Sequence, residues 1–242
     1  MRITACTDIG CRHSINEDTY LAGRLSDGTG WIVMCDGMGG VASGREAGHF
    51  VAGYLSAAVQ EAYFRRDPDR PVEEFMVEQV KNCNRELFKI SVDATNTITM
   101  GTTVVFVIIR NGVAKIVHAG DSRAYYIGKK TISRVTVDHS MVQEMVDSGR
   151  LTEEEAKTHP HKNIITSAIG VDPNPRVDVD TLRLKAGECI LVCSDGLSNT
   201  ISDEELFEIM KNSDFYEAAE LMVRLAVKRK VMDNVTAVIL EE

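Results

Sequence analysis

The stretch from Trp31 to Gly40, WIVMCDGMGG, constrains the fold of this chain more than any other part of the sequence. Its apolar run is typical of a strand that is buried on both faces, and the run ends abruptly at Asp36. The glycines that follow let the backbone turn sharply and approach a ligand closely. Asp36 is therefore expected at the rim of a rigid sheet, which suits a metal ligand and is an expensive place for an unpaired charge.

Three other aspartates stand at the ends of apolar runs. Asp121 and Asp195 come just after such runs, and Asp233 comes just before one. If the four strand ends meet, their carboxylates form a cluster, and clustered carboxylates repel one another unless cations neutralise them. A site made only of oxygen ligands suits Mg²⁺, Mn²⁺ or Ca²⁺ rather than zinc.

The composition is that of an ordinary globular protein, and 242 residues suffice for one large domain or two small ones. The formal net charge of −9 disfavours general binding to nucleic acid or to an anionic membrane. None of the six cysteines forms a CxxC pair, which favours free thiols in a reducing cytoplasm over a disulfide framework. No signal peptide is expected at the first residue, and no run reaches the ~18 apolar residues of a membrane helix.

Apolar periodicity predicts helices over about 42–63 and 72–92, followed by sheet after Gly101. Asn111-Gly112 is a strong hairpin signal within that sheet. Segment 138–170 differs from its surroundings and predicts a flap with two short helices, the first capped by Asp138 and the second by a capping box. The remaining predicted elements are strands at 2–7, 20–22, 31–35, 102–109, 113–119, 124–127, 177–184, 188–193 and 234–240, and two helices near 202–211 and 214–226.

This order of elements is not the strict alternation of a parallel β/α fold. It fits two antiparallel sheets packed together with pairs of helices outside, a four-layer α/β/β/α sandwich of the α+β class. We see no domain linker, and we therefore expect a single domain over 1–242 with a small flap subdomain over about 138–170.

Eight short motifs occur along the chain in this order: Thr7-Asp8-Ile9-Gly10, Asn16-Glu17-Asp18, Asp36-Gly37-Met38-Gly39-Gly40 with Gly44, Gly101-Thr102-Thr103, Ala119-Gly120-Asp121-Ser122-Arg123, Asp138-His139-Ser140, Ser194-Asp195-Gly196 and Asp233-Asn234-Val235-Thr236. Together they resemble the metal-dependent protein serine/threonine phosphatases of the phosphatase 2C type, and the bacterial members in particular. The resemblance covers nearly the whole chain. It implies the layered sandwich fold and a flap that lies beside the active site and influences substrate choice.

The resemblance also implies a centre for two Mn²⁺ or Mg²⁺ ions. Asp36 would bridge the ions, and Asp195 and Asp233 would complete the ligands of the first. The Gly37 carbonyl and Glu17, directly or through water, would serve the second. Two such ions can hold the phosphate oxygens and share a water that attacks phosphorus directly, without an enzyme nucleophile.

Two more carboxylates receive roles by the same resemblance. Asp18 would orient the metal ligands without being a ligand itself. Asp121, together with Asp195, would hold a third and looser ion, as bacterial members often do. Taken alone, Asp121 is equally well explained as a turn residue.

One position departs from the family pattern. An arginine that grips the substrate phosphate usually stands four residues before the glutamate, and here that position is His13, preceded by Arg12. Either Arg12 reaches in from a shifted loop, or His13 substitutes as a pH-dependent donor. Because histidine has an ordinary pKa of about 6.5, it is the weaker clamp at neutral pH. We therefore expect weaker phosphate binding than the family norm, with Arg12 and His13 both as candidates for the catalytic site.

The resulting interpretation is a Mn²⁺- or Mg²⁺-dependent phosphatase that acts on phosphoserine and phosphothreonine in proteins. Its expected partners are phosphorylated substrates of a bacterial Ser/Thr kinase. We expect a cytoplasmic monomer without nucleic-acid or membrane binding. Two alternatives remain open: a pseudophosphatase that binds phosphoproteins, supported only by the altered arginine position, and an enzyme for a small phosphate ester.

Overall fold

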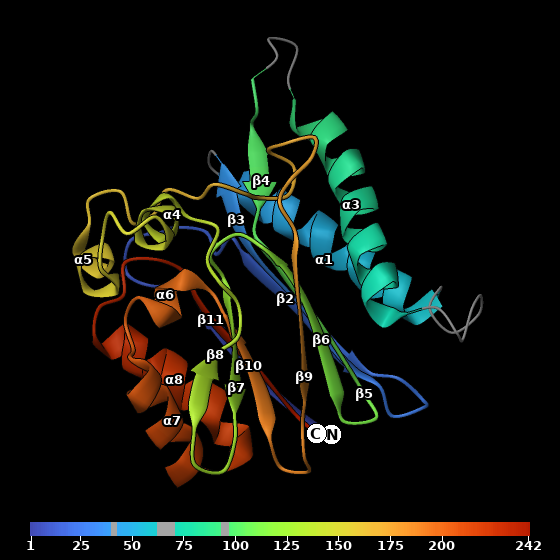
Figure 1. The fold of residues 1–242 in the computed structure, drawn as a ribbon, viewed down its shortest axis with the longest axis vertical. Coiled ribbons are helices and arrows are strands. Elements are labelled where there is room, and N and C mark those ends of the chain that lie inside the picture. Colours follow the sequence, from blue (N-terminus) through green and yellow to red (C-terminus); the bar gives the residue numbers. More distant parts are fainter. Residues whose placement is uncertain (40–42, 62–70, 93–96) are drawn as a thin grey trace.

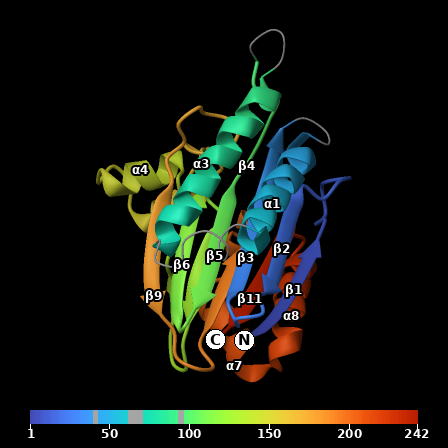
Figure 2. The ribbon, with the colours of Figure 1, turned by 90° about the vertical axis from the view of Figure 1, so that its right-hand side faces the viewer.

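The computed structural model describes residues 1–39, 43–61, 71–92 and 97–242. Two antiparallel sheets face one another, and helices cover the outer side of each (Figures 1 and 2). The first sheet has the strand order β1 (Arg2–Asp8), β11 (Val235–Glu241), β10 (Cys189–Cys193), β7 (Arg123–Ile127), β8 (Ile132–Arg134). The second has the order β2 (Asp18–Arg24), β3 (Gly30–Gly39), β5 (Val104–Arg110), β6 (Val113–Ala119), β9 (Asp178–Arg183), and β4 (Met100–Thr102) pairs with the end of β3.

The helices divide between the two outer sides and the flap. Helices α1 (Ser43–Glu61) and α3 (Val72–Ser91) pack on the second sheet, and α7 (Asp203–Asn212) and α8 (Phe215–Lys228) cover the first (Figure 1). A short helix, α6 (Asp195–Ser198), follows β10, and the flap carries α4 (Met141–Asp147) and α5 (Glu153–Thr158). The predicted α/β/β/α sandwich is therefore the observed architecture. Residues 42, 62 and 63 of the first predicted helix lie outside the described residues.

The core has three apolar layers, and β3 contributes to two of them. Trp31, Val33 and Cys35 pack under α1 and α3, whereas Ile32 and Met34 point between the sheets. These five side chains are at most 5% exposed, and full burial of a large apolar side chain is worth about 1.5–3 kcal/mol. Because both faces of the strand are buried, a slip of one residue would misplace all of them. The register of β3, and with it the position of Asp36, is thereby set.

Local sequence signals account for several turns and helix ends. Asn111 and Gly112 both adopt positive φ, 52° and 70°, in the turn between β5 and β6. Thr152 and Ser202 begin α5 and α7 with complete capping boxes, and the Asp214 side chain caps α8. The predicted hairpin turn at Asn111-Gly112 and the predicted capping box of the second flap helix are thereby confirmed.

The cap of the first flap helix differs from the sequence interpretation. The cap of α4 is Ser140, which accepts a hydrogen bond from the Gln143 N–H, and not Asp138. Asp138 instead pairs with Arg123 at 2.7 Å, because a largely buried carboxylate gains more from a charged partner than from a helix end. The consecutive strands β9 and β10 lie in different sheets. Among the described helices, none combines the length and the apolar character that crossing a membrane would require.

Candidate active site

Asp18 joins the two sheets at the edge where the predicted metal ligands lie. In the β2–β3 pair it stands directly opposite Asp36. Its Oδ2 accepts hydrogen bonds from the hydroxyl of Ser194, at the end of β10, at 2.8 Å and from that of Thr236, in β11, at 2.7 Å. Its Oδ1 is buried and has no hydrogen-bond partner. One carboxylate thus connects the strand ends that carry Asp36, Asp195 and Asp233.

The backbone of Asp36 is held by the neighbouring threonines. Its N–H donates to Thr103 Oγ1 at 3.0 Å, and its carbonyl accepts from the Thr103 N–H and from Thr102 Oγ1, both at 2.9 Å. The Thr103 hydroxyl also bonds to the Ser122 hydroxyl at 2.8 Å. The Gly101-Thr102-Thr103 motif therefore ties the end of β3 to the loop that carries Asp121.

Glu17 lies beside the glycines that follow Asp36. The Gly37 N–H donates to the Glu17 carbonyl at 3.3 Å, and the Glu17 N–H donates to Asn234 Oδ1 at 2.8 Å. A Cβ at Gly37 would lie 2.2 Å from the Gly44 carbonyl oxygen, and one at Gly44 would lie 2.6 Å from Glu17 Oε1. Only glycines allow this close packing. Glu17 Oε1 is buried and has no hydrogen-bond partner among the residues that the structure describes.

Asp233 is positioned by the loop after β1. Gly10 has φ of +72°, and a Cβ there would lie 2.0 Å from the Asp233 carbonyl oxygen. Asn234, the next residue, donates from Nδ2 to the Ile9 carbonyl at 2.9 Å. The Thr7-Asp8-Ile9-Gly10 motif thus wraps the segment that enters β11.

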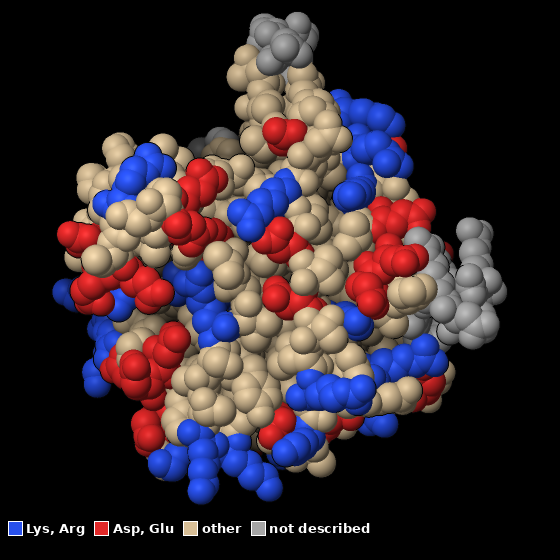
Figure 3. Space-filling view, in the orientation of Figure 1, with Lys and Arg blue, Asp and Glu red and all other residues tan. Residues whose placement is uncertain are grey.

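Asp121 and Asp195 lie where the chain leaves a strand. Gly120, Asp121 and Ser122 carry the chain from β6 in one sheet to β7 in the other, and Asp195 begins α6 directly after β10. Both aspartates line one end of a cleft of about 770 Å³ between the flap and α7. Figure 3 shows acidic and basic side chains interspersed over this part of the surface.

The ionised forms of these carboxylates are destabilised by burial and by one another. Burial and, after it, the charges of neighbouring carboxylates raise the pKa of Asp18 to about 7, of Asp121 to about 8 and of Asp195 to about 6. Burial and the charges of Asp18 and Asp195 raise the pKa of Asp36 well above its ordinary value. Such a cluster is stable in its charged form only when cations neutralise it.

The donor set fits hard divalent cations. Within the described part of the chain, three buried carboxylate oxygens of this cluster lack a hydrogen-bond partner: Glu17 Oε1, Asp18 Oδ1 and Asp121 Oδ1. All the side-chain candidates offer oxygen, the ligand that Mg²⁺ and Mn²⁺ prefer. The assignment of individual residues to individual ions stays a prediction.

The two candidates for phosphate binding lie in the loop before Glu17. His13 is exposed, and its Nε2 lies 3.2 Å from Asp233 Oδ1, so this side chain reaches the carboxylate cluster. Arg12 is exposed as well.

Sequence reasoning did not single out Lys162 of the flap, which lines the cleft and whose charge lowers the pKa of Asp195. No local pattern marks Lys162, because its place depends on how the flap folds back.

Comparisons with known proteins identify the family of this chain. A sequence model described as Protein phosphatase 2C matches residues 11–235. The chain belongs to the protein phosphatase 2C family. The predicted family and the predicted enzyme class, a protein serine/threonine phosphatase, are thereby confirmed, and the family is metal-dependent.

Two bacterial members of the phosphatase 2C family match this chain over most of their length. The serine/threonine phosphatase stp of Listeria monocytogenes serotype 4b is 30% identical over 97% of this chain and 93% of its own. The protein phosphatase PhpP of Streptococcus pneumoniae is 32% identical over 98% and 95%.

Solved structures of the phosphatase 2C family share the fold. The serine/threonine phosphatase of S. agalactiae has a TM-score of 0.90 at 32% identity and covers 100% of this chain and 99% of its own. The catalytic domain of the phosphatase PstP, solved in complex with 2 manganese ions, has a TM-score of 0.84 at 29% identity, with 99% and 97% covered.

Proposed function

We propose that this chain is a Mn²⁺- or Mg²⁺-dependent phosphatase that hydrolyses phosphoserine and phosphothreonine in proteins. The observation that carries the proposal is the convergence of carboxylates from both sheets, with three of their oxygens buried and unpartnered. The relatives named serine/threonine phosphatases support phosphoproteins as the substrate class.

In this proposal Asp36, Asp195 and Asp233 would hold one ion, and Asp36, Glu17 and the Gly37 carbonyl would hold the other. When bound, two such ions supply positive charge to the phosphate oxygens and lower the pKa of the attacking water. The chain itself holds the carboxylates close together against their mutual repulsion, namely those of Glu17, Asp18, Asp36, Asp195 and Asp233. Hydrogen bonds to Asp18 from Ser194 and Thr236 support that role, because they fix the strand ends relative to one another.

We further propose a single domain over 1–242 whose flap, about 138–170, contributes one wall of the substrate cleft. The kinase opposed by this enzyme would be a bacterial Ser/Thr kinase, and the protein would act as a cytoplasmic monomer. Free thiols at all six cysteines support a reducing compartment.

The proposal is tested by hydrolysis of p-nitrophenyl phosphate and of a phosphothreonine peptide, with EDTA, Mg²⁺ or Mn²⁺. We expect metal-dependent turnover in the wild type. In Asp36→Asn we expect kcat to fall by more than about 100-fold. Losses of about 10- to 100-fold are typical when a residue that only supports the metal ligands is replaced. Calorimetry of Mn²⁺ binding to both proteins provides the second readout.

The alternatives predict different results. Mn²⁺ binding without turnover on either substrate would identify a pseudophosphatase. A strong preference for the small ester over the peptide would favour the small-ester enzyme. Equal activity with and without EDTA would contradict the metal-dependent mechanism.

A further inference from the structure

Two buried histidines and an aspartate form a compact group beside the Asp121 loop. His118, at the end of β6, and His139 are at most 1% exposed, and their rings stack with centroids 4.7 Å apart. Asp178, at the start of β9, completes the group, and ligand atoms of the three side chains all lie within 4.8 Å of one another. By composition the group resembles a metal site.

The hydrogen bonds of the rings argue for a different role. His118 Nε2 lies 2.9 Å from the Val137 carbonyl, which can only accept, so this nitrogen carries the proton. His139 Nδ1 accepts from the Gly120 N–H at 3.3 Å, so in the neutral ring Nε2 carries the proton and faces Asp178 Oδ2 at 3.2 Å. A metal on that Nε2 would leave the His139 ring with no proton at all. We therefore do not assign a metal to this group.

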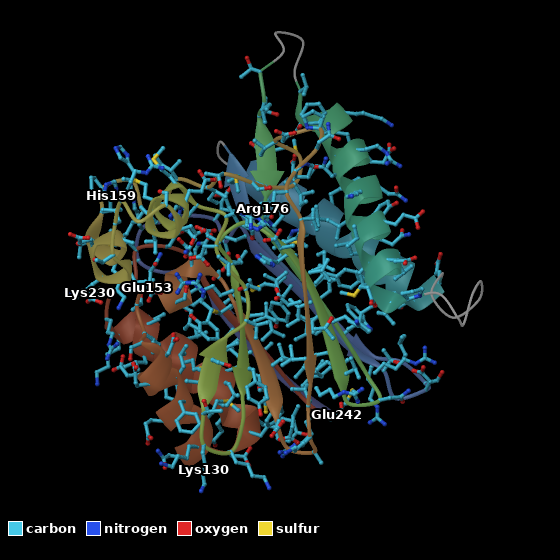
Figure 4. All side chains as sticks on the ribbon, viewed as in Figure 1. Lys130, Glu153, His159, Arg176, Lys230 and Glu242 are labelled. Atoms are coloured by element: carbon cyan, nitrogen blue, oxygen red, sulfur yellow. The ribbon has the colours of Figure 1, made fainter. Side chains whose placement is uncertain are left out.

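The charges around His139 agree with a neutral ring. Burial lowers the pKa of His139, and the neighbouring His118 lowers it further. Asp178 is engaged by Arg176, whose hydrogen bonds lower the pKa of that carboxylate. Figure 4 shows Arg176 beside β9. The Asp178 carboxylate therefore stays charged and keeps the His139 proton on Nε2.

His139 joins three segments that are far apart in the sequence. Its N–H donates to the Gly120 carbonyl at 2.9 Å, and its Nδ1 accepts from the Gly120 N–H, so both peptide groups of Gly120 are held. Its own carbonyl accepts from the Thr166 N–H at 2.8 Å, where the chain returns from the flap. Its Nε2 faces Asp178 in β9.

Gly120 is the residue that directs Asp121 into the cluster. It has φ of +109°, and a Cβ there would lie 2.6 Å from Thr103 Cγ2, so the peptide has little freedom. The next residue, Asp121, is 8% exposed and presents an unpartnered buried Oδ1. Any shift of the Gly120 peptide would move that oxygen.

We propose that His139 is a positioning residue that holds Asp121 ready for an ion and couples the flap to that carboxylate. This inference rests on the proposed function, and it adds a residue that acts through Gly120 rather than on substrate or ion. The His139 imidazole holds Gly120, and the His139 backbone carbonyl holds Thr166 at the base of the flap. A change at the base of the flap is therefore linked to a change in ion affinity at Asp121.

The test compares His139→Leu with His139→Asn. The asparagine amide oxygen can replace Nδ1 as the acceptor for the Gly120 N–H, whereas leucine fills the space without an acceptor. Calorimetry with Mn²⁺ gives the affinity of the weakest site, which is the third ion site expected at Asp121. We expect His139→Leu to weaken that site about 10- to 100-fold and to leave the tighter sites unchanged, and His139→Asn to stay within about 3-fold of the wild type.

A second pair of variants keeps the inference testable if His139→Leu does not fold. Asp178→Ala removes the partner of Nε2, whereas Asp180→Ala, two residues along the same strand, removes a carboxylate 4.0 Å from His118 Nδ1. We expect weaker binding at the weakest Mn²⁺ site in Asp178→Ala only, with the same melting temperature in EDTA for both variants.

The outcomes separate the inference from the proposed function. Equal losses in His139→Leu and His139→Asn, or no change in either, would overturn the positioning role while leaving the phosphatase activity in place. A wild type without a third, weaker site would overturn it as well. Mn²⁺ binding with the expected pattern but no turnover in the wild type would support the positioning role and contradict the proposed function.

Discussion

At the scale of single residues, we propose that position 13 sets how firmly a phosphate is held beside the carboxylates. His13 Nε2 lies 3.2 Å from Asp233 Oδ1, so the side chain at this position reaches the cluster. A guanidinium offers a permanent charge and two parallel donors to a phosphate, and an imidazole offers neither. We therefore propose His13, rather than Arg12, as the neighbour of a bound phosphate.

We expect His13→Arg to lower KM for a phosphothreonine peptide by about 5- to 10-fold, equivalent to about 1 kcal/mol at 25 °C. The reason is the added bidentate charge, and kcat should change less than KM. Steady-state kinetics at saturating Mn²⁺ measure both. Arg12→Ala is the control and should leave KM unchanged. A higher KM in Arg12→Ala, with none of the gain in His13→Arg, would assign phosphate binding to Arg12 instead.

At the scale of elements, the first turn of α1 lies so close to the end of β3 that side chains are excluded from the contact. A Cβ at Gly44 would meet Glu17 Oε1 at 2.6 Å and the Gly37 carbonyl carbon at 2.7 Å. Helix α1 therefore does two jobs, because its apolar face covers the second sheet and its first turn limits where Glu17 can lie.

Gly44→Ala should displace Glu17 and destabilise the fold by about 1–3 kcal/mol, the range typical of overpacking. Mn²⁺-dependent turnover should fall with it. The matched control is Gly53→Ala in the same helix, where an added Cβ meets nothing within 4 Å. That variant should gain about 0.5–1 kcal/mol, because alanine loses less conformational freedom in a helix than glycine does. Urea unfolding measures both changes, and equal effects of the two substitutions would contradict the role given to Gly44.

At the scale of the whole molecule, the edge where the two sheets meet carries a cluster of carboxylates that repel each other. The three carboxylates Asp18, Asp121 and Asp195 have pKa values of about 7, 8 and 6 in the folded chain, against about 4 in an unfolded one. The metal-free folded state therefore binds more protons than the unfolded state between about pH 4 and pH 8. Its stability falls as the pH rises through that window.

We expect the melting temperature in EDTA to fall between pH 5 and pH 8. His139 acts in the opposite direction, because its pKa is lowered and its contribution is lost as the pH falls below about 6.5. It is one group against these three carboxylates and Asp36, whose pKa is also raised. Mn²⁺ should stabilise the protein more at pH 8 than at pH 5, because ions bind the deprotonated carboxylates. Thermal melts across this range provide the measurement. A melting temperature in EDTA that rises from pH 5 to pH 8 would show that the carboxylates do not govern stability.

Much of this molecule could be predicted from local patterns. The buried run of β3 ending at Asp36, the turn at Asn111-Gly112 and the capping box at Ser202 are each recorded by a few neighbouring residues. Burial of a strand on both faces, positive φ and unsatisfied helix ends select particular residue types over a few neighbouring positions, so their signals survive in a single sequence.

What only the tertiary structure decided are contacts between distant segments. Asp18 binds Ser194 and Thr236, 176 and 218 residues away, and nothing near any of the three marks the pairing. Asp138 would suit a helix cap by its residue type, but Arg123 takes it. The sequence by itself determined which residues end each strand and carry charge. The packing of two sheets determined which of those charges meet, because a buried carboxylate takes the partner that three-dimensional proximity offers and not the one nearest in the chain.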